Sequence, residues 1–576
     1  MSSLPLGQKH FRPFLYYVLL LVLNLALYWT VLGGWWTIDD PALLRALIEH
    51  GVWRQFYDPA VWRAHYPVPA PGVLTPWVYL SLGLDYRLFG LHPMGFYAHH
   101  LLAHLLLIIV LYKALEAYLK PNGAFWAAVV FSCSIPAAST VSLLQMRHYL
   151  EGMILALLSL LCFRKAIQRR ALPYAILGAC CYAASTTAKE SYVLLPAVLL
   201  LLPGVHPWRE RRYIYPFACI GLVYMAWRAY MLGFHGMFDA YDDLLWFEWK
   251  LVGKALNAIP FHFGLDGSWQ LILGLISLSP FLIYMYEKGG FWVLLRIFGW
   301  MGIIFLPLMQ VLDFTAPWYF NILCILLSTA AVFGIREVYF LGFKGRLIAV
   351  VACLSLSVAA LYAFSNWKIM YDRYLNIRYR IEGQFVLENG GQQDMLVMPM
   401  ERWWHYYESL SWLRQNVLHL GPGPQVCSQM IACRETLSPL ASYFYDGRRL
   451  VGGDWPTLGE YMECELRTSE QGAPPHLRIE IGYSVDQLGI GRLYWIFEPK
   501  RSRRYQVFIS NPTHGVIGFR IPFPAHGQFA YNVRQPVNLM VHYDDGGRCW
   551  TSPAIEINPQ SVSSGQVLWM GWPPHP

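Results

Sequence analysis

Long apolar runs alternate with short polar loops over the first 364 residues of the chain. A helix needs about 20 apolar residues to cross the hydrocarbon core of a bilayer. Eleven runs approach that length, of which the fourth and sixth are short: residues 13–34, 97–119, 123–141, 149–163, 171–188, 191–203, 213–233, 269–286, 291–311, 317–335 and 346–364. The pattern predicts an α-helical polytopic membrane protein with about eleven transmembrane helices.

The pattern changes after residue 364. Residues 365–394 are rich in Tyr, Arg, Asn and Glu and predict a helical connector. From about residue 395, short alternating runs such as 477–481, 505–509 and 537–541 are separated by Gly, Pro and Asn. Alternation with period two between turn residues is typical of β-strands. We therefore expect a membrane domain at 1–364, a connector at 365–394 and a β-rich, sandwich-like domain at 395–576.

Two loops carry an amphipathic pattern instead of a continuous apolar run. Residues 37–65 place leucines on one helical face and then add aromatic side chains, and residues 244–262 combine helical periodicity with charges. Helices of this kind lie in the membrane interface. We expect interfacial helices within the loops 35–97 and 234–268. If residues 244–262 cross the membrane instead, the orientation of every later span is inverted.

Composition and charge support a membrane protein and give it an orientation. Hydrophobic residues make up 56% of the chain and charged residues 14%, whereas about a quarter of a soluble domain is charged. The net charge of +8 lies largely in basic loops near residues 164–170, 209–212 and 336–346, which the positive-inside rule assigns to the cytoplasm. The charge therefore does not indicate nucleic-acid binding.

The N-terminal run follows Lys9 and Arg12 and has no small-residue cleavage site, which predicts a retained signal anchor with a cytoplasmic N-terminus. An odd number of spans then leaves the C-terminal domain outside, in the periplasm of a bacterial inner-membrane protein. The loops that contain Asp39-Asp40, Arg147-His148 and Lys189-Glu190 face the same side.

Seven of the eleven cysteines lie in apolar runs, where a small buried hydrophobic residue is expected. The other four, Cys427, Cys433, Cys464 and Cys549, lie in the outward domain. An oxidising compartment permits two disulfides there. We favour Cys427 with Cys433 and Cys464 with Cys549, although four cysteines allow three pairings. No cysteine spacing predicts a zinc site.

The charged pairs on the outward side are candidates for function. Asp39 and Asp40 follow the first span. An ionisable group at a membrane boundary costs desolvation energy unless it is hydrated, forms an ion pair or has a function. The alternative for either aspartate is to cap a helix that begins at Pro41. Arg147-His148 and Lys189-Glu190 place cations where topology does not favour them, which indicates anion binding.

His100 and His104 are four residues apart and share one helical face. They lack a carboxylate or cysteine partner at a metal-binding spacing, so we do not expect a metal site. Two interpretations stay open, a polar role inside the protein and contact of His100 with phosphate at the mouth of an outward cavity.

Together these groups suit transfer of a group from a lipid-linked phosphate. A carboxylate can deprotonate the acceptor hydroxyl, and Arg or Lys can stabilise the departing phosphate. A transporter or flippase of a lipid-linked saccharide is the alternative, although its charges would more naturally lie in the middle of the spans. A non-catalytic membrane subunit is a third hypothesis.

Several of these segments resemble the GT-C glycosyltransferases. The matching segments are Asp39-Asp40, residues 76–93 leading into His99-His100 and His104, Met146-Arg147-His148, and Ala188-Lys189-Glu190. The chain is most similar to the branch that contains the transmembrane and tetratricopeptide-repeat O-mannosyltransferases and their bacterial relatives. The resemblance covers roughly residues 1–260, is weaker to 364 and is absent beyond.

The resemblance implies inverting transfer of a sugar from a polyprenyl-phosphate donor on the outer side of the membrane. It makes Asp40 or Asp39 the general base and places Arg147, His148 and Lys189 near the donor phosphate, with Glu190 orienting Lys189. No 34-residue tetratricopeptide repeat is present, so the acceptor is a glycan, a lipid or a protein. No cofactor is firmly implied, and a requirement for a divalent metal stays open.

Overall fold

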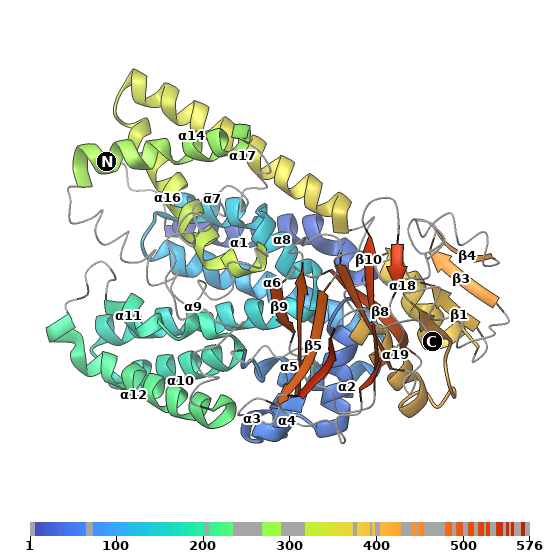
Figure 1. The fold of residues 1–576 in the computed structure, drawn as a ribbon. Helices are drawn as coiled ribbons and strands as arrows, with labels where there is room; N and C mark the ends of the chain where they lie inside the picture. The colour runs from blue at the N-terminus through green and yellow to red at the C-terminus, as the bar shows by residue number, and fades with distance from the viewer. Residues whose placement is uncertain are drawn as a thin grey trace. The chain divides into compact units, whose positions relative to one another are not determined.

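The computed structural model describes residues 6–64, 73–200, 202, 205, 207–233, 268–289, 317–371, 377–391, 394–397, 404–427, 441–445, 449–453 and nine strands between Arg478 and Met570. The chain forms two compact units (Figure 1). The first contains Met1–Trp35, Gln55–Tyr57 and Pro71–Tyr374, and the second contains Trp36–Arg54, Asp58–Ala70 and Leu375–Pro576. The first polar loop of the chain is therefore divided between the units.

The first unit is helical and contains four described helices that are long and apolar enough to cross a membrane. They are Phe14–Gly33, Pro93–Glu116, Asn321–Tyr339 and Phe343–Tyr362. These segments coincide with the predicted spans 13–34, 97–119, 317–335 and 346–364, as expected of an integral membrane protein. The total of eleven stays a prediction, because the span 291–311 and the interfacial helix 244–262 lie outside the described residues.

The predicted span 123–141 is a pair of helices, α7 (Pro121–Ser132) and α8 (Ile135–Ser142), bent by 60°. The side chain of Ser134 caps α8 by accepting the backbone N–H of Ala137 at 3.3 Å. Pro136 lies in the first turn of α8, where its missing N–H costs no helical hydrogen bond. Capping and proline therefore begin a second helix here. The pair counts as a fifth span if both helices belong to one crossing.

The first unit also contains the helices that carry the candidate residues and their neighbours in the chain. They are α5 (Trp77–Phe89), α6 (Pro93–Glu116), α9 (Arg147–Arg169), α10 (Leu172–Ala188), α11 (Leu195–Leu200), α12 (Pro207–Leu232) and α14 (Ser268–Tyr284). Helices α9, α10 and α12 run side by side (Figure 1). Gly152 of α9 allows close packing, because a Cβ atom there would lie only 2.6 Å from the Tyr192 ring.

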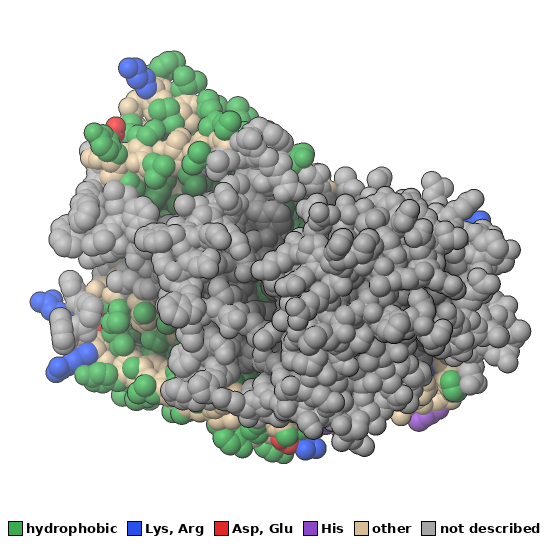
Figure 2. Space-filling model, in the orientation of Figure 1, with side chains coloured by type: hydrophobic (Ala, Val, Ile, Leu, Met, Phe, Trp, Pro, Cys, Tyr) green, Lys and Arg blue, Asp and Glu red, His purple; other side chains and the backbone are tan. Residues whose placement is uncertain are grey.

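Apolar side chains cover much of the described helical surface (Figure 2). On α17 (Phe343–Met370), Leu347, Leu354 and Leu361 follow one another at intervals of seven and are 59%, 63% and 67% exposed. A row of exposed leucines would be costly in water but is the normal surface of a helix in lipid. The exposed apolar row thus supports the assignment of this helix as a membrane span.

The second unit combines helices with two sheets. Its helices include α2 (Asp40–His50), α4 (Pro59–Ala64), α18 (Ile377–Gln384) and α19 (Trp404–Asn416). One sheet has nine strands, with β12 (Ile555–Ile557) paired to β10 beside the path β11-β10-β7-β8-β2-β1-β3-β4. The other has the order β13-β5-β6-β9. The bounds are β1 Asp394–Val397, β2 Gln425–Cys427, β3 Ala441–Tyr445, β4 Leu450–Gly453, β5 Arg478–Val485, β6 Gly491–Glu498, β7 Tyr505–Asn511, β8 Val516–Pro522, β9 His526–Phe529, β10 Val537–Asp544, β11 Cys549–Thr551 and β13 Gln566–Met570.

The predicted strands at 477–481, 505–509 and 537–541 are found as β5, β7 and β10. The larger sheet also contains parallel pairs, which an antiparallel sandwich does not have: β1 pairs in parallel with both β2 and β3. The helix α19 lies between β1 and β2 in the chain, and a parallel pair needs such a crossover. The polar and aromatic sequence of α19 did not reveal this helix.

Helix α2 of the first loop packs against α19 within the second unit. Arg45 on α2 forms an ion pair with Glu408 on α19 at 3.0 Å, and its guanidinium lies over the Trp412 ring. The Tyr406 hydroxyl lies 3.1 Å from the carbonyl oxygen of Trp36, the residue that opens this segment. These contacts fix the loop that carries Asp39 and Asp40.

Candidate functional site

The acidic pair forms a tight turn at the start of α2. Both the backbone N–H and the hydroxyl of Thr37 donate to Asp40 Oδ2, at 2.7 and 3.2 Å, and the Asp40 N–H donates back to the Thr37 carbonyl at 2.8 Å. Asp40 is 2% exposed. This is half of a capping box: the acid accepts the threonine N–H, but the Asp40 N–H bonds to the Thr37 carbonyl and not to its hydroxyl. The local sequence therefore explains why Asp40 is held in one orientation.

The turn holds Ile38 at a φ of 42°. A β-branched residue in the left-handed region is a genuine outlier and costs of the order of 1–3 kcal/mol. Asp39 is partly exposed at the N-cap position of α2, but its side chain makes no capping hydrogen bond. The helix begins at Asp40, one residue before the expected Pro41. Simple capping therefore does not account for Asp39.

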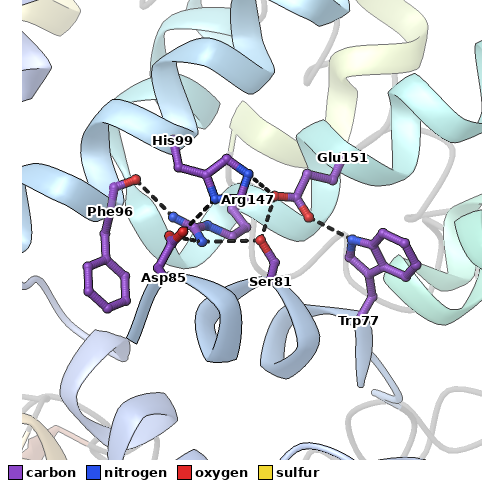
Figure 3. Close-up of polar contacts among 7 residues, drawn as sticks. All are labelled: Trp77, Ser81, Asp85, Phe96, His99, Arg147 and Glu151. Atoms are coloured by element: carbon purple, nitrogen blue, oxygen red, sulfur yellow. Dashed lines mark hydrogen bonds and ion pairs between the residues drawn. The ribbon is translucent and has the colours of Figure 1, made fainter. Parts of the chain in front are cut away.

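Arg147 lies at the start of α9, and its guanidinium is completely buried (Figure 3). Nη1 donates to Asp85 at 2.5 Å and to Ser81 at 3.1 Å, and Nη2 donates to the Phe96 carbonyl at 3.0 Å. Asp85 is 1% exposed and also lies 2.7 Å from His99 Nδ1. Arg147 thus ties α5 and α6 to α9.

Glu151, one turn after Arg147, extends this network (Figure 3). It accepts hydrogen bonds from Trp77 Nε1 and from the Ser81 hydroxyl, both at 2.6 Å. Trp77, Ser81 and Asp85 are spaced by four along α5 and therefore share one helical face. We name the set Trp77, Ser81, Asp85, His99, Arg147 and Glu151 the Asp85 cluster.

A second buried cluster surrounds Glu190, between α10 and α11. Lys189 Nζ lies 3.0 Å from Glu190 Oε2, and Arg228 on α12 lies 3.8 Å from Oε1. The backbone N–H of Leu74 donates to the same Oε1 at 2.6 Å. The Lys189 ammonium also lies over the Tyr149 ring, 5.0 Å from its centroid. We name Leu74, Tyr149, Lys189, Glu190 and Arg228 the Glu190 cluster.

The surroundings of Glu190 fix its charge. Burial alone would raise its pKa, but Lys189, Arg228 and the Leu74 N–H together lower the pKa to about 2. Glu190 is therefore a carboxylate at every physiological pH, and it holds the Lys189 ammonium in place. Lys189 itself is 7% exposed.

The two histidines that were candidates for phosphate contact lie in different settings. His148 follows Arg147 on α9, beside the Tyr149 ring, and its buried Nδ1 has no hydrogen-bond partner among the described residues. His100 is fully buried in α6, and its Nε2 bonds to the Thr140 carbonyl at 2.8 Å. The carbonyl can only accept, so Nε2 carries the proton. His100 contact with phosphate stays a prediction.

The beginning of α9 brings the two clusters close together. Arg147 and Glu151 contact α5 and α6, whereas Tyr149 contacts Lys189. Within the described part of the chain, Arg147 and Lys189 share no hydrogen-bond or ion-pair partner. Asp39 and Asp40 belong to the other compact unit. The roles of all these residues stay predictions.

Sequence reasoning missed Asp85, Glu151 and Arg228. A signal for each was present, because polar residues spaced by four within apolar segments mark one shared face, and a lone arginine in an apolar run is rarely without function or partner. The side chains of Cys427, Cys433, Cys464 and Cys549 lie outside the described residues, so their pairing stays a prediction. The described residues contain no group of three side chains suited to a metal ion.

No protein-family model and no curated protein matches the chain. Several solved glycosyltransferase structures are similar to it at low identity. One is the Archaeoglobus fulgidus oligosaccharyltransferase with zinc and sulfate, with 13% identity, 69% of this chain and 61% of that chain covered, and a TM-score of 0.41. This chain therefore spans about three fifths of that enzyme's length.

Two bacterial proteins show a similar level of likeness. ArnT of Cupriavidus metallidurans bound to undecaprenyl phosphate has 12% identity, 77% of this chain and 95% of that chain covered, and a TM-score of 0.43. Arabinosyltransferase EmbB of Mycobacterium smegmatis has 13% identity, 100% of this chain and 65% of that chain covered, and a TM-score of 0.40.

Proposed function

We propose that the protein is a glycosyltransferase that moves a sugar from a polyprenyl-phosphate donor to a glycan, lipid or protein acceptor at the outer face of the membrane. The observation that carries the proposal is the burial of the Lys189 ammonium group and the set of partners around it. Among the residues that the structure describes, this buried ammonium has one carboxylate partner, Glu190, which also lies close to Arg228.

An ammonium group has three N–H donors. Glu190 forms an ion pair with Lys189 at 3.0 Å, and the Tyr149 ring faces the cation. N–H donors of the ammonium therefore remain for a ligand. A phosphate with several acceptor oxygens matches a fixed cation with spare donors. Stabilisation of a departing phosphate by such a group lowers the barrier to transfer.

Arg147 takes a positioning role in this proposal. Its guanidinium is 0% exposed, and three of its five N–H donors bond to Asp85, Ser81 and the Phe96 carbonyl, so protein encloses it completely. The proposal therefore gives Arg147 an indirect role, and its direct contact with phosphate stays a prediction from the sequence. His148 stays a candidate for phosphate contact because its Nδ1 has no described partner.

Asp40 is the proposed general base, with Asp39 as the alternative. Thr37 donates twice to Asp40 Oδ2, which fixes the carboxylate, and Ile38 holds the strained turn beside it. Backbone strain of this kind gathers at functional sites because the surrounding structure must support it. Undecaprenyl phosphate, the ligand in the ArnT structure, is the kind of lipid phosphate that the proposed transfer would release.

The test uses purified full-length protein in lipid nanodiscs, with undecaprenyl phosphate that carries a radiolabelled hexose. We expect label to move to an acceptor or to water. Asp40→Asn should lower kcat by about 100-fold or more, as removal of a general base does. Asp58→Asn is the matched control, since Asp58 lies in the same loop and its capping of α4 is retained by asparagine; we expect its kcat to stay within threefold.

If label never moves from the donor, hydrolysis included, the transferase proposal fails. Movement of intact donor across the bilayer in proteoliposomes would then support the flippase alternative. Full turnover by Asp40→Asn with loss in Asp39→Asn would assign the base to Asp39.

A further inference from the structure

The Asp85 cluster is a ring of hydrogen bonds with one side open. Asp85 binds Arg147 and His99, Arg147 binds Ser81, and Ser81 binds Glu151. The last step, from Glu151 Oε1 back to His99 Nε2, measures 4.0 Å. This exceeds the 2.7–3.2 Å of a hydrogen bond, so the two atoms are not bonded. The described residues give His99 Nε2 no other partner.

The open side is also the accessible side of the cluster. The His99 side chain is 31% exposed and that of Glu151 12%, whereas those of Arg147 and Asp85 are 0% and 1% exposed. The closed part of the ring holds both groups in place, because Asp85 fixes the imidazole while Trp77 and Ser81 fix the carboxylate (Figure 3).

The hydrogen bonds define what the open side presents to a ligand. The Asp85 carboxylate can only accept, so His99 Nδ1 carries a proton, and Nε2 is an acceptor in the form of the imidazole with one proton. Glu151 Oε1 accepts from Ser81 and has a second lone pair free. A ligand that bridges these two atoms in that form must therefore donate two hydrogen bonds. The carboxylates of Asp85 and Glu151 at least balance the cations of the cluster, so the open side does not attract an anion.

We infer that His99 and Glu151 form a subsite that binds two neighbouring hydroxyl groups of a sugar. A vicinal diol offers two O–H donors at a separation that fits acceptors 4.0 Å apart. The inference rests on the proposed function, because the sugar in question is the one carried by the donor lipid. Asp85 and Arg147 are positioning residues in this scheme.

The place of the subsite on α9 suits that role. Glu151 is two residues from Tyr149, whose ring contacts Lys189, and a helix rises about 1.5 Å per residue. The two side chains are about 3 Å apart along the helix axis but point in different directions around it. The chain links the two clusters more directly, because the Leu74 N–H donates to Glu190 and Trp77, three residues later, donates to Glu151.

The experiment measures binding of two kinds of lipid to the full-length protein in nanodiscs. The probes are undecaprenyl phosphate and the same lipid carrying glucose, mannose, galactose or arabinose. We expect at least one of the sugar-bearing lipids to bind about tenfold tighter than the bare lipid, as two hydrogen bonds to a fixed acceptor pair allow.

The variants distinguish contact of His99 and Glu151 with the sugar from a purely structural role of these residues. His99→Asn keeps an amide near the position of Nδ1 and so retains the bond to Asp85, but leaves nothing at Nε2. We expect its preference for the sugar-bearing lipid to fall below threefold while the Kd for bare undecaprenyl phosphate changes less than threefold. His99→Gln places its amide near Nε2 and should restore part of the preference. Glu151→Gln should reduce the preference in the same way.

Three results would overturn the inference. One is a sugar preference that survives in both His99→Asn and Glu151→Gln. Another is an equal loss of bare-lipid and sugar-lipid binding, which would show a purely structural role. A third is bare-lipid binding by the wild type with no preference for any of the four sugars. Failure of the wild type to bind either kind of lipid would instead overturn the proposed function, and the inference with it.

Discussion

The Asp85 and Glu190 clusters both include residues of α9, but their charged side chains have different kinds of partner. In the Asp85 cluster, the terminal nitrogens of Arg147 donate hydrogen bonds to the buried Asp85, to Ser81 and to the Phe96 carbonyl. In the Glu190 cluster, one carboxylate lies close to two cations and a backbone N–H. The first ion pair is completely enclosed, because the Arg147 side chain is 0% exposed. The second leaves Lys189 7% exposed, with N–H donors available for a ligand.

The difference shows why a buried cation alone does not mark a binding site. An ion pair that is completely enclosed by protein holds helices together, and losing one partner leaves an uncompensated charge. A buried ammonium with one shared partner is the better candidate for an incoming anion. Arg147 and Lys189 are both cations in predicted outward loops of the sequence, and only the structure shows that their partners differ.

Replacement of Arg147 should have the largest effect on stability. Arg147→Met leaves Asp85 buried without its guanidinium, so we expect the free energy of unfolding to fall by about 3–5 kcal/mol. The measurement is equilibrium unfolding in mixed micelles. Arg87→Met is the matched control, because Arg87 is an exposed arginine on the same helix as Asp85, and its effect should stay within about 0.5 kcal/mol.

A second change sharpens this result. Asp85→Asn in the Arg147→Met protein removes the stranded charge and should recover part of the lost stability. If Arg147→Met unfolds like the wild type while transfer is lost, Arg147 is a ligand contact and its positioning role is wrong.

Acid should destabilise the Glu190 cluster by protonating the Glu190 carboxylate. The pKa of Glu190 is about 2 in the folded chain against an ordinary 4.5, so its contribution is present above pH 4.5 and is lost as pH falls toward 2. The shift corresponds to about 3 kcal/mol. The stability of the wild type should therefore fall further between pH 5 and pH 3 than that of Glu190→Gln. Parallel curves for the two proteins would contradict the ion-pair assignment.

The smallest effect concerns the packing beside Lys189. A Cβ atom at Gly152 would lie 2.6 Å from Tyr192 and 3.0 Å from the Ala188 Cβ. We expect Gly152→Ala to cost about 1–3 kcal/mol by overpacking and to raise KM for the donor, since Ala188 precedes Lys189. Gly123→Ala is the control, because its nearest contact would be an ordinary 3.5 Å. Equal effects of the two changes would argue against close packing at α9.

Periodicity and length were enough to predict the membrane helices near 13–34, 97–119, 317–335 and 346–364, and the strands β5, β7 and β10. These elements have strong local patterns. The break at Ser134 was not predicted, because capping and proline act over a few residues inside an apolar run. The crossover through α19 was also missed, since its sequence is aromatic and polar with no clear apolar stripe.

The candidate residues were predicted by their placement in polar loops, but their partners were not. Asp85 is 62 residues from Arg147, and Leu74 is 116 residues from Glu190. Contacts at such separations depend on how helices pack, which a single sequence does not specify. The distinction between a completely enclosed ion pair and one with a partly exposed cation therefore appears only in the structure.

Binding of bare undecaprenyl phosphate to Lys189→Met tests the central claim most directly. Methionine keeps the length and apolar stem of lysine and removes only the ammonium, and Arg228 still lies near Glu190. We predict that the protein in nanodiscs loses affinity for the lipid by about tenfold or more, as loss of charge-assisted hydrogen bonds requires, while its unfolding free energy falls by less than that of Arg147→Met. Unchanged lipid affinity in a folded Lys189→Met protein would contradict the account.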